Sequence, residues 1–255
     1  MESLLNAWVW VMTVSVVIVG TPVVTLVWLF TAPFDRGRYA AGRAFRLLGV
    51  VAVRMNPLWR FEVTGQMIRD PRRPYVAVAN HESWADVFLL CHLPWEMKWL
   101  SKDAMFKIPC FGWMMRMAGD IMLRRGERGS GAQALLAARD RLSKRVSVMI
   151  FPEGTRSRDG SMLPFKDGAF RLAIEAGVPV LPMVLAGTRY AIAKGSMRWT
   201  KAHARLRVLP SVETTGLTLD DVGALRDRVR DIIAEAREQL LAELQQENGT
   251  SQQLA

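Results

Sequence analysis

The most chemically suggestive stretch of the chain is Asn80-His81-Glu82-Ser83-Trp84-Ala85-Asp86, which follows an apolar run at residues 75–79. The run is typical of a buried strand and a helical pattern begins behind the stretch, so His81 is expected in a strand-to-helix loop. Five positions of continuous helix turn two side chains apart by about 500°, so His81 meets Asp86 only by folding back over the helix start. An imidazole held by a carboxylate in this way could act as a general base.

The same residues allow a purely structural interpretation. Ser83 and Asp86 fit the Ser-x-x-Asp pattern of a capping box, in which side chains satisfy the free N–H groups at a helix start. A lone histidine is also more often a surface or hydrogen-bonded residue than a catalytic one. The seven residues alone leave both interpretations open.

A second candidate group is Phe151-Pro152-Glu153-Gly154-Thr155-Arg156-Ser157, which ends another buried run. It places a carboxylate (Glu153), a hydroxyl (Thr155) and a guanidinium (Arg156) on one loop. Gly154 lets a ligand approach the backbone closely, and an arginine can hold a phosphate through two parallel hydrogen bonds. A simple turn in which Glu153 pairs with Arg156 is the alternative.

Two further stretches are less specific. Arg124 and Arg125 follow the apolar run at 121–123, and neighbouring residues of a strand point to opposite faces. One arginine can therefore face a crevice while the other meets solvent, and the charge pattern does not say which. The buried run at 178–184 contains two prolines, which predict an edge strand or a bulge.

At 255 residues, half of them hydrophobic, the chain is long enough for one sizeable domain and an appendage. Its formal charge of +10 suits a nucleic acid, an anionic membrane surface or a phosphorylated substrate equally well. Cys91 and Cys110 suggest no disulfide framework, which fits a reducing compartment. His81, His92 and His203 lack partners at ligand spacing, so zinc is not expected.

The segment from Leu4 to Phe30 contains no charged residue. As one helix, its roughly 27 residues would measure about 40 Å against a hydrocarbon core of about 30 Å. Met1-Glu2-Ser3 lacks the positive charge of a signal peptide, so we expect a membrane anchor. Gly20-Thr21-Pro22 predicts a kink or a tight turn, and either one kinked span or two half-helices in one leaflet would fit.

Arginines interleaved with apolar residues follow this segment in an amphipathic pattern. They are Arg36, Arg38, Arg43, Arg46 and Arg54. We expect an interfacial helix with its arginines among the headgroups of the cytoplasmic leaflet, which would place the following domain on the cytoplasmic side of the inner membrane. The alternative is an ordinary amphipathic helix packed on the domain.

From about residue 60 onward, strand-like runs alternate with helical patterns, which indicates an α/β sheet. The clearest strands are expected at 75–79, 98–102, 121–123, 146–151, 178–185 and 204–208, and a long terminal helix at 219–244. We predict an anchoring segment at residues 1–58, a globular domain at 59–247 and a disordered tail at 248–255.

In chain order, four of these blocks resemble the glycerolipid acyltransferases, especially the 1-acyl-glycerol-3-phosphate (lysophosphatidic acid) acyltransferases. Asn80-His81 with Asp86 is similar to their His-x4-Asp motif, and Gly119 to Arg125 resembles their Gly-x-x-x-apolar-x-Arg block. Phe151 to Ser157 matches the third block, and Val178 to Val184 resembles the fourth. The resemblance covers roughly residues 60–210, and four blocks in order are a specific signal.

The resemblance implies a single mixed sheet flanked by helices, of the glycerol-3-phosphate acyltransferase type. The reaction would move a fatty acyl group from acyl-CoA or acyl carrier protein to the sn-2 hydroxyl of 1-acyl-glycerol 3-phosphate, giving phosphatidic acid. His81 would be the general base, oriented by Asp86. Cationic side chains would hold the acceptor's phosphate, and the third block would fix its own loop or contact the glycerol. The binding residues implied are Arg125, Glu153, Gly154, Thr155, Arg156 and additionally Lys102.

No metal or tightly bound cofactor is implied, and the expected partners are a lysophospholipid, an acyl thioester, acyl carrier protein as one possible donor, and the membrane. The same chemistry could serve another lysophospholipid, glycerol 3-phosphate or a lyso-aminolipid. A noncatalytic protein could instead use its basic helix to bind an anionic membrane. Ser83 lacks the Gly-x-Ser-x-Gly elbow of a serine hydrolase, and nothing resembles a nucleic-acid module.

Overall fold

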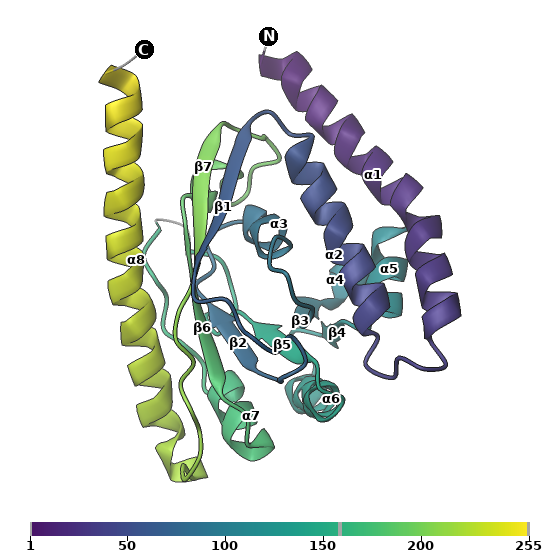
Figure 1. Ribbon diagram of the computed structural model, residues 1–255, viewed down its shortest axis with the longest axis vertical. Coiled ribbons are helices and arrows are strands. Elements are labelled where there is room, and N and C mark those ends of the chain that lie inside the picture. The colour runs from purple at the N-terminus through teal and green to yellow at the C-terminus, as the bar shows by residue number, and fades with distance from the viewer. Residues whose placement is uncertain (1, 158–159, 254–255) are drawn as a thin grey trace.

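A seven-stranded sheet lies between two layers of helices in the computed structural model, which describes residues 2–157 and 160–253 (Figure 1). The strands are β1 (Trp59–Gly65), β2 (Val76–Ala79), β3 (Met97–Lys102), β4 (Ile121–Leu123), β5 (Ser147–Ile150), β6 (Val180–Ala186) and β7 (Ala202–Val208). The helices are α1 (Glu2–Thr31), α2 (Tyr39–Arg54), α3 (Ala85–Leu90), α4 (Asp103–Phe106), α5 (Phe111–Ala118), α6 (Ser130–Ser143), α7 (Gly168–Ala176) and α8 (Val222–Gln253), with short 3-10 turns η1 (Thr188–Tyr190) and η2 (Leu219–Asp221).

The strand order across the sheet is β1-β7-β6-β2-β5-β3-β4. Strands β2 to β6 run parallel to one another, whereas β6 and β7 pair antiparallel, so β1 and β7 run the opposite way. The sheet is therefore mixed, and the predicted fold class is confirmed. Because parallel strands end at a common edge, the loops after β2, β3, β4, β5 and β6 all lie at one edge of the sheet.

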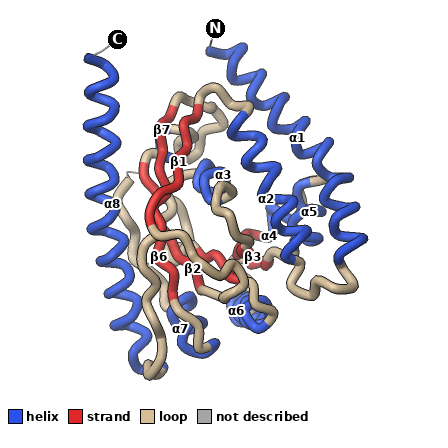
Figure 2. The backbone as a smooth tube through the Cα atoms, in the orientation of Figure 1, coloured by secondary structure: helices blue, strands red, loops and turns tan. Residues whose placement is uncertain are grey.

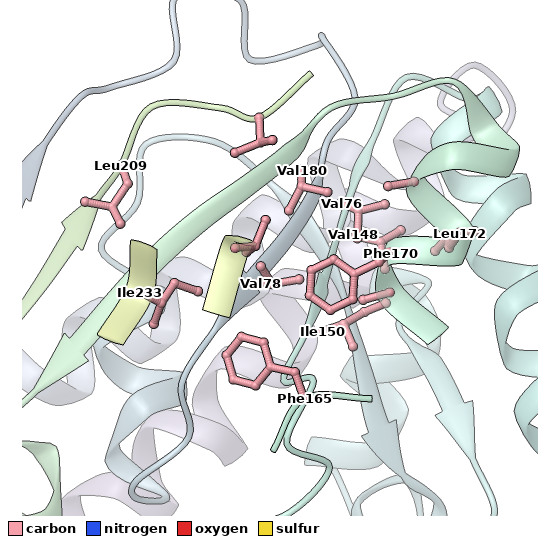
Figure 3. Packing of buried hydrophobic residues seen from close by; sticks show 14 of the residues in the cluster. Val76, Val78, Val148, Ile150, Phe165, Phe170, Leu172, Val180, Leu209 and Ile233 are labelled. Atoms are coloured by element: carbon pink, nitrogen blue, oxygen red, sulfur yellow. The ribbon is translucent and has the colours of Figure 1, made fainter. Parts of the chain in front are cut away.

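Alternation along the strands divides the core between the two faces of the sheet. Val76 and Val78 of β2 face a cluster that includes α6, α7 and α8, where Phe170 and Ile233 are fully buried (Figure 3). Ala77, between the two valines, belongs to the cluster on the other face, with α3 and α2. Figure 2 shows these two helical layers on either side of the strands. Burial of each large apolar side chain contributes about 1.5–3 kcal/mol, so the sheet is held from both sides.

The N-terminal apolar segment forms one continuous helix, α1, with Pro22 inside it. The tight turn and the pair of half-helices considered from the sequence do not form. Gly20 has another role, because a Cβ there would lie 2.2 Å from Leu48 Cδ1, so the missing side chain lets α2 approach α1 closely. By length and composition α1 could cross a membrane, and few of its residues are buried.

Helix α2 confirms the predicted amphipathic helix but corrects the place of one arginine. Arg46 is only 3% exposed, donates a hydrogen bond from Nη2 to Asp120 and lies 3.6 Å from Glu96. Its guanidinium also lies 3.8 Å from the ring centroid of Trp99. The expectation that Arg46 lies among headgroups is wrong, because periodicity marks a polar position without revealing a carboxylate 74 positions away.

The fourth sequence block forms β6, an interior strand, so the edge-strand alternative is wrong. The bulge alternative is confirmed by the pairing on the β7 side, where Met183 pairs with Val208 and Val180 with Val212. Three steps on β6 thus face four steps on its partner. Pro182 lies at this bulge. Proline has no backbone N–H to donate, and at the bulge the hydrogen-bond ladder on the β7 side is already interrupted, so its lack of a donor is tolerated there.

Helix α8 runs along the outside of the sheet and continues to Gln253 (Figure 1). The predicted disordered tail at 248–255 stays a prediction, and residues 254 and 255 lie outside the described residues. A capping box between Thr218 and Asp221 forms at the short 3-10 turn η2, directly before α8. The predicted boundary between the anchoring segment and the globular domain, at residue 58, stays a prediction. Val50 of α2, which lies before that boundary, packs in the core of the sheet domain.

Candidate active site

The residues singled out from the sequence gather at the carboxyl edge of the parallel strands. His81 follows β2, the Glu153–Arg156 loop follows β5, Lys102 ends β3 and Arg125 follows β4. Since β2, β5, β3 and β4 are neighbours in that order, these segments stand in line along the edge. Thr188, after β6, adds a residue on the other side of β2.

The loop after β2 folds back over the start of α3, so that His81 Nδ1 lies 2.7 Å from Asp86 Oδ2. The same oxygen accepts the backbone N–H groups of Glu82 and Ser83, at 2.8 and 3.0 Å, and Oδ1 accepts the hydroxyl of Thr188. Asp86 is fully buried. A carboxylate is an acceptor only, so these four donors fit it, and an Nδ1–H given to Asp86 leaves His81 Nε2 as a proton acceptor.

Asp86 also forms part of the capping pattern that the sequence allowed. The Ser83 N–H donates to Asp86, which is one half of a capping box. The reciprocal half is not formed, because Ser83 Oγ accepts from the N–H of Ala85 at 3.1 Å and donates to the carbonyl of Ile192 at 2.7 Å. The carboxylate that holds His81 thus also accepts the N–H of Ser83 just before α3, although the N-cap residue Trp84 has no side-chain cap.

The loop after β5 fixes both the backbone and the ring of His81. The His81 N–H donates to Glu153 Oε1 at 2.7 Å, and the Ser157 N–H donates to the His81 carbonyl at 3.0 Å. The Phe151 ring stacks on the imidazole, with 3.9 Å between centroids and 14° between planes. His81 keeps one fifth of its side chain exposed, so the histidine is rigidly held yet accessible.

Glu153 is a loop-forming residue, and the predicted alternative of a Glu153–Arg156 ion pair is wrong. Its second oxygen, Oε2, accepts the N–H of Leu163 at 2.9 Å, so both oxygens are used by backbone groups. Burial raises the pKa of Glu153 to about 7, although these two N–H groups favour the charged form. Gly154 is half-buried and Thr155 is exposed at the tip of the same loop.

Four cations from four segments gather beside this loop, and we call Lys102, Arg125, Arg156 and Lys194 the cation cluster. Burial together with the charges of Arg125, Arg156 and Lys194 lowers the pKa of Lys102. Lys194 Nζ donates to the Arg156 carbonyl at 2.6 Å, and Arg125 donates to the Gly154 carbonyl. Within residues 2–157 and 160–253, no carboxylate forms an ion pair with any of the four. Like charges gathered in this way fit an anionic ligand.

Arg156 carries a further sign of a missing partner. Its guanidinium carbon lies 5.2 Å from the ring centroid of Trp84, while Nη1 is buried and donates to no acceptor in the described part of the chain. Buried donors are nearly always satisfied, so Nη1 fits a group that a ligand would bring.

Two site residues, Thr188 and Lys194, lie outside the four sequence blocks. Both follow β6 in a segment whose local pattern carries no motif, so only the fold brings them to the site. The structure also separates the two adjacent arginines, because Arg124 pairs with Glu127 at 3.4 Å while Arg125 joins the cation cluster.

Among the residues that the structure describes, one group of side chains elsewhere has ligand atoms close enough to hold a metal ion, at Glu62, His203 and Glu247. Arg205 donates to Glu62 at 2.6 Å and to Glu247 at 3.0 Å. The group is therefore an ion-pair cluster that fastens α8 to β1 and β7.

Comparison with known proteins identifies the family. The family described as Acyltransferase matches residues 60–186. The 1-acyl-sn-glycerol-3-phosphate acyltransferase alpha of Homo sapiens is 40% identical over 173 residues, which cover 67% of this chain and 61% of the human protein. This chain belongs to the acyltransferase family. A chloroplastic 1-acyl-sn-glycerol-3-phosphate acyltransferase of Brassica napus is 36% identical over 186 residues, or 72% of this acyltransferase and 53% of the plant protein.

The fold of this acyltransferase also has a solved counterpart. The crystal structure of the 1-acyl-sn-glycerophosphate (LPA) acyltransferase PlsC from Thermotoga maritima matches it with a TM-score of 0.75 and 27% sequence identity, covering 94% of this chain and 98% of that chain. This chain spans 60 or 61% of the length of the human, sheep and cattle relatives. The family resemblance inferred from the four blocks is confirmed.

Proposed function

We propose that this acyltransferase moves a fatty acyl group from a thioester to the sn-2 hydroxyl of 1-acyl-glycerol 3-phosphate, giving phosphatidic acid. The observation that carries the proposal is an accessible histidine held by a buried aspartate, beside four cations that form no ion pair within the described residues, on one sheet edge. The relatives named above, which are 1-acylglycerol-3-phosphate acyltransferases, support the same assignment.

In the proposed mechanism, His81 Nε2 takes the proton of the glycerol hydroxyl as its oxygen attacks the thioester carbonyl. The new C–O bond gives a tetrahedral intermediate, which collapses with loss of the thiolate, and the imidazolium returns the proton to sulfur. Asp86 keeps His81 in the reactive tautomer and stabilises the imidazolium. The nucleophile belongs to the substrate, so no acyl-enzyme is required.

The cation cluster is the proposed site of the acceptor's phosphate. The Arg156 guanidinium lies against the Trp84 ring, with a buried Nη1 that has no acceptor among the described residues, and Arg125 donates to the Gly154 carbonyl, so both groups are held before the ligand arrives. Lys102 and Lys194 add positive charge. Glu153 and Gly154 would fix the loop, and the exposed Thr155 would contact the glycerol. The donors of an oxyanion hole are left unassigned.

We further propose that the enzyme is attached to the inner membrane through α1 and α2, with the sheet domain in the cytoplasm. Support comes from both ends of α1. Asn6 exchanges two hydrogen bonds with the backbone of Trp199, at 2.9 and 2.7 Å, and Val24 is buried against Phe45 and Met114. A helix held to the domain at both ends fits an orientation along one leaflet better than a span. Acyl carrier protein and acyl-CoA are the proposed donors.

The test is turnover by the purified protein in detergent. Lysophosphatidic acid, lysophosphatidylcholine, glycerol 3-phosphate and a lyso-aminolipid would be offered with acyl-CoA and, separately, with acyl carrier protein. We expect rapid formation of phosphatidic acid from lysophosphatidic acid with at least one donor. Robust transfer only to an acceptor without a phosphate would overturn the acceptor assignment, and no transfer with any pair would overturn the activity.

A further inference from the structure

The segment directly after the fourth block begins with a turn that only glycine can make. Gly187 has φ of +89°, and a Cβ there would lie 2.3 Å from the carbonyl oxygen of His203 on β7. The turn ends β6 and starts η1, whose first residue is Thr188. The backbone is thus forced into the path that brings Thr188 beside the loop of the His–Asp pair.

Thr188 is fully buried, and its hydroxyl donates a hydrogen bond to Asp86 Oδ1. The two residues are 102 positions apart in the chain. A buried hydroxyl needs a partner, and backbone carbonyls would have served. Here the partner is the one carboxylate that also accepts from His81.

The hydrogen bond from Thr188 matters because of how the donors are divided between the two oxygens of Asp86. Oδ2 accepts from the His81 ring and from the N–H groups of Glu82 and Ser83, whereas Oδ1 accepts from Thr188. Three donors hold Oδ2, and the bond from Thr188 also holds Oδ1, so donors on both oxygens together set the plane of the carboxylate. That plane sets the direction from which the imidazole N–H must approach.

We propose that Thr188 is a positioning residue for the general base, which fixes the plane of Asp86 and thereby the orientation and tautomer of His81. The proposal rests on the acyl transfer proposed above, and it extends the catalytic arrangement to a residue beyond the four sequence blocks. A threonine that merely satisfied its own hydroxyl would affect folding without affecting His81.

The test compares Thr188→Val, which keeps the shape and removes the hydroxyl, with Thr188→Ser, which keeps the hydroxyl. Thr214→Val is the matched control, because Thr214 is also buried and donates its hydroxyl to a carbonyl, that of Val178, at 3.1 Å. Initial rates with lysophosphatidic acid and acyl-CoA give kcat and KM for each variant, and thermal unfolding gives Tm. The Thr188→Val change is also made in an Asp86→Asn background.

We expect kcat of Thr188→Val to fall by about 10- to 100-fold, the size expected for a buried carboxylate that loses one donor. KM for the acceptor should change by less than about threefold, because Thr188 is not in the cation cluster. Thr188→Ser should restore most of kcat, and Thr188→Val should add little to Asp86→Asn, because the two act as a unit. If Thr188→Val loses Tm as Thr214→Val does while keeping kcat, or if its effect adds fully to that of Asp86→Asn, the proposal is wrong.

A second readout needs no turnover. In protein labelled with ¹⁵N-histidine, the Nδ1 proton of His81 can be assigned by its loss in His81→Ala, and its chemical shift reports the bond to Asp86. We expect Thr188→Val to move this resonance and Thr214→Val to leave it in place; an unmoved resonance in Thr188→Val would overturn the proposal. If the wild type fails to acylate lysophosphatidic acid while this resonance behaves as expected, the proposed function fails and the positioning role of Thr188 stands.

Discussion

Arg125 donates a hydrogen bond from Nη2 to the carbonyl of Gly154, whereas its neighbour Arg124 turns away and pairs with Glu127 at 3.4 Å. The two residues are adjacent and alike in charge, and both side chains are exposed. Their side chains point to different sides of the segment after β4, and only Arg125 joins the cation cluster. The two residues therefore form a matched pair for testing that cluster.

Arg125→Met should raise KM for lysophosphatidic acid by about 10- to 100-fold, because a charge-assisted hydrogen bond to phosphate is worth roughly 1.5–3 kcal/mol. Arg124→Met removes the same charge from the neighbouring position and should leave KM within about threefold of the wild type. Acceptor saturation curves at fixed acyl-CoA measure both. Equal effects of the two variants would mean that only the net charge of the protein matters.

Asp86→Asn should lower kcat by between about 10²- and 10⁴-fold, because Asp86 both orients His81 and stabilises its charged form. Asparagine offers one acceptor oxygen to the four donors around Asp86, so Tm should fall as well. Asp70→Asn, at an exposed position, is the control and should change neither value. An Asp86→Asn enzyme with kcat within threefold of the wild type would contradict the assignment.

A pH-dependent stability is expected from Glu82. Burial raises its pKa from 4.5 to about 7, although Arg237 donates two hydrogen bonds to Oε1. The folded state thus binds this proton more tightly than the unfolded chain does, so the stabilisation is complete below pH 4.5 and is lost as the pH rises through about 7. The shift corresponds to at most about 3 kcal/mol.

Glu82→Gln, which is neutral at every pH, should therefore leave Tm near that of the wild type at pH 5 and raise it at pH 8. Glu62→Gln is the opposing control. Burial, which alone would raise the pKa of Glu62, is outweighed there by the hydrogen bonds and charge of Arg205, so the pKa lies below its usual value. The ionised Glu62 stabilises the fold above pH 4.5, and Glu62→Gln should lower Tm at pH 8. The same difference from the wild type at both pH values for Glu82→Gln would refute this account.

The proposed orientation of α1 along one leaflet predicts that its two ends face the same side of the membrane. Ser3→Cys, in the first turn of α1, and Arg36→Cys, after its last turn, would report on the two ends in a Cys110→Ser background. The remaining Cys91 is unreactive, because burial raises the pKa of its thiol to about 12. In inside-out vesicles, an impermeant maleimide should label both positions. Labelling of one position only would indicate a helix that crosses the bilayer.

Local pattern was sufficient for the strands and for placing His81 and Asp86 on one loop, and the reasons are physical. The apolar run before His81 and the helical pattern after Asp86 fix a loop between them, and a loop of that length permits the contact that is observed. The third block likewise lies directly after a buried strand, so Arg156 had to emerge at the end of that strand. Parallel strands then bring such ends together.

Features that depend on distant partners could not be predicted in this way. Arg46 repeats at helical spacing like its neighbours, and its buried position follows from Asp120, 74 positions away. Thr188 and Lys194 lie in a segment without a motif, and their contacts with Asp86 and Arg156 cross 102 and 38 positions. Their roles are set by tertiary structure, which a local pattern does not encode.

The most direct test of the account is the turnover of His81→Ala with lysophosphatidic acid and acyl-CoA. His92→Ala is the control, because His92, just after α3, donates a hydrogen bond from Nδ1 to the carbonyl of Phe88 at 3.0 Å and takes no part in the site. Both variants should still sediment with phospholipid vesicles, since α1 and α2 are unchanged. We predict that His81→Ala loses about 10²- to 10⁴-fold in kcat while His92→Ala keeps wild-type turnover. A folded His81→Ala protein that turns over within threefold of the wild type would contradict the central claim that His81 is the general base.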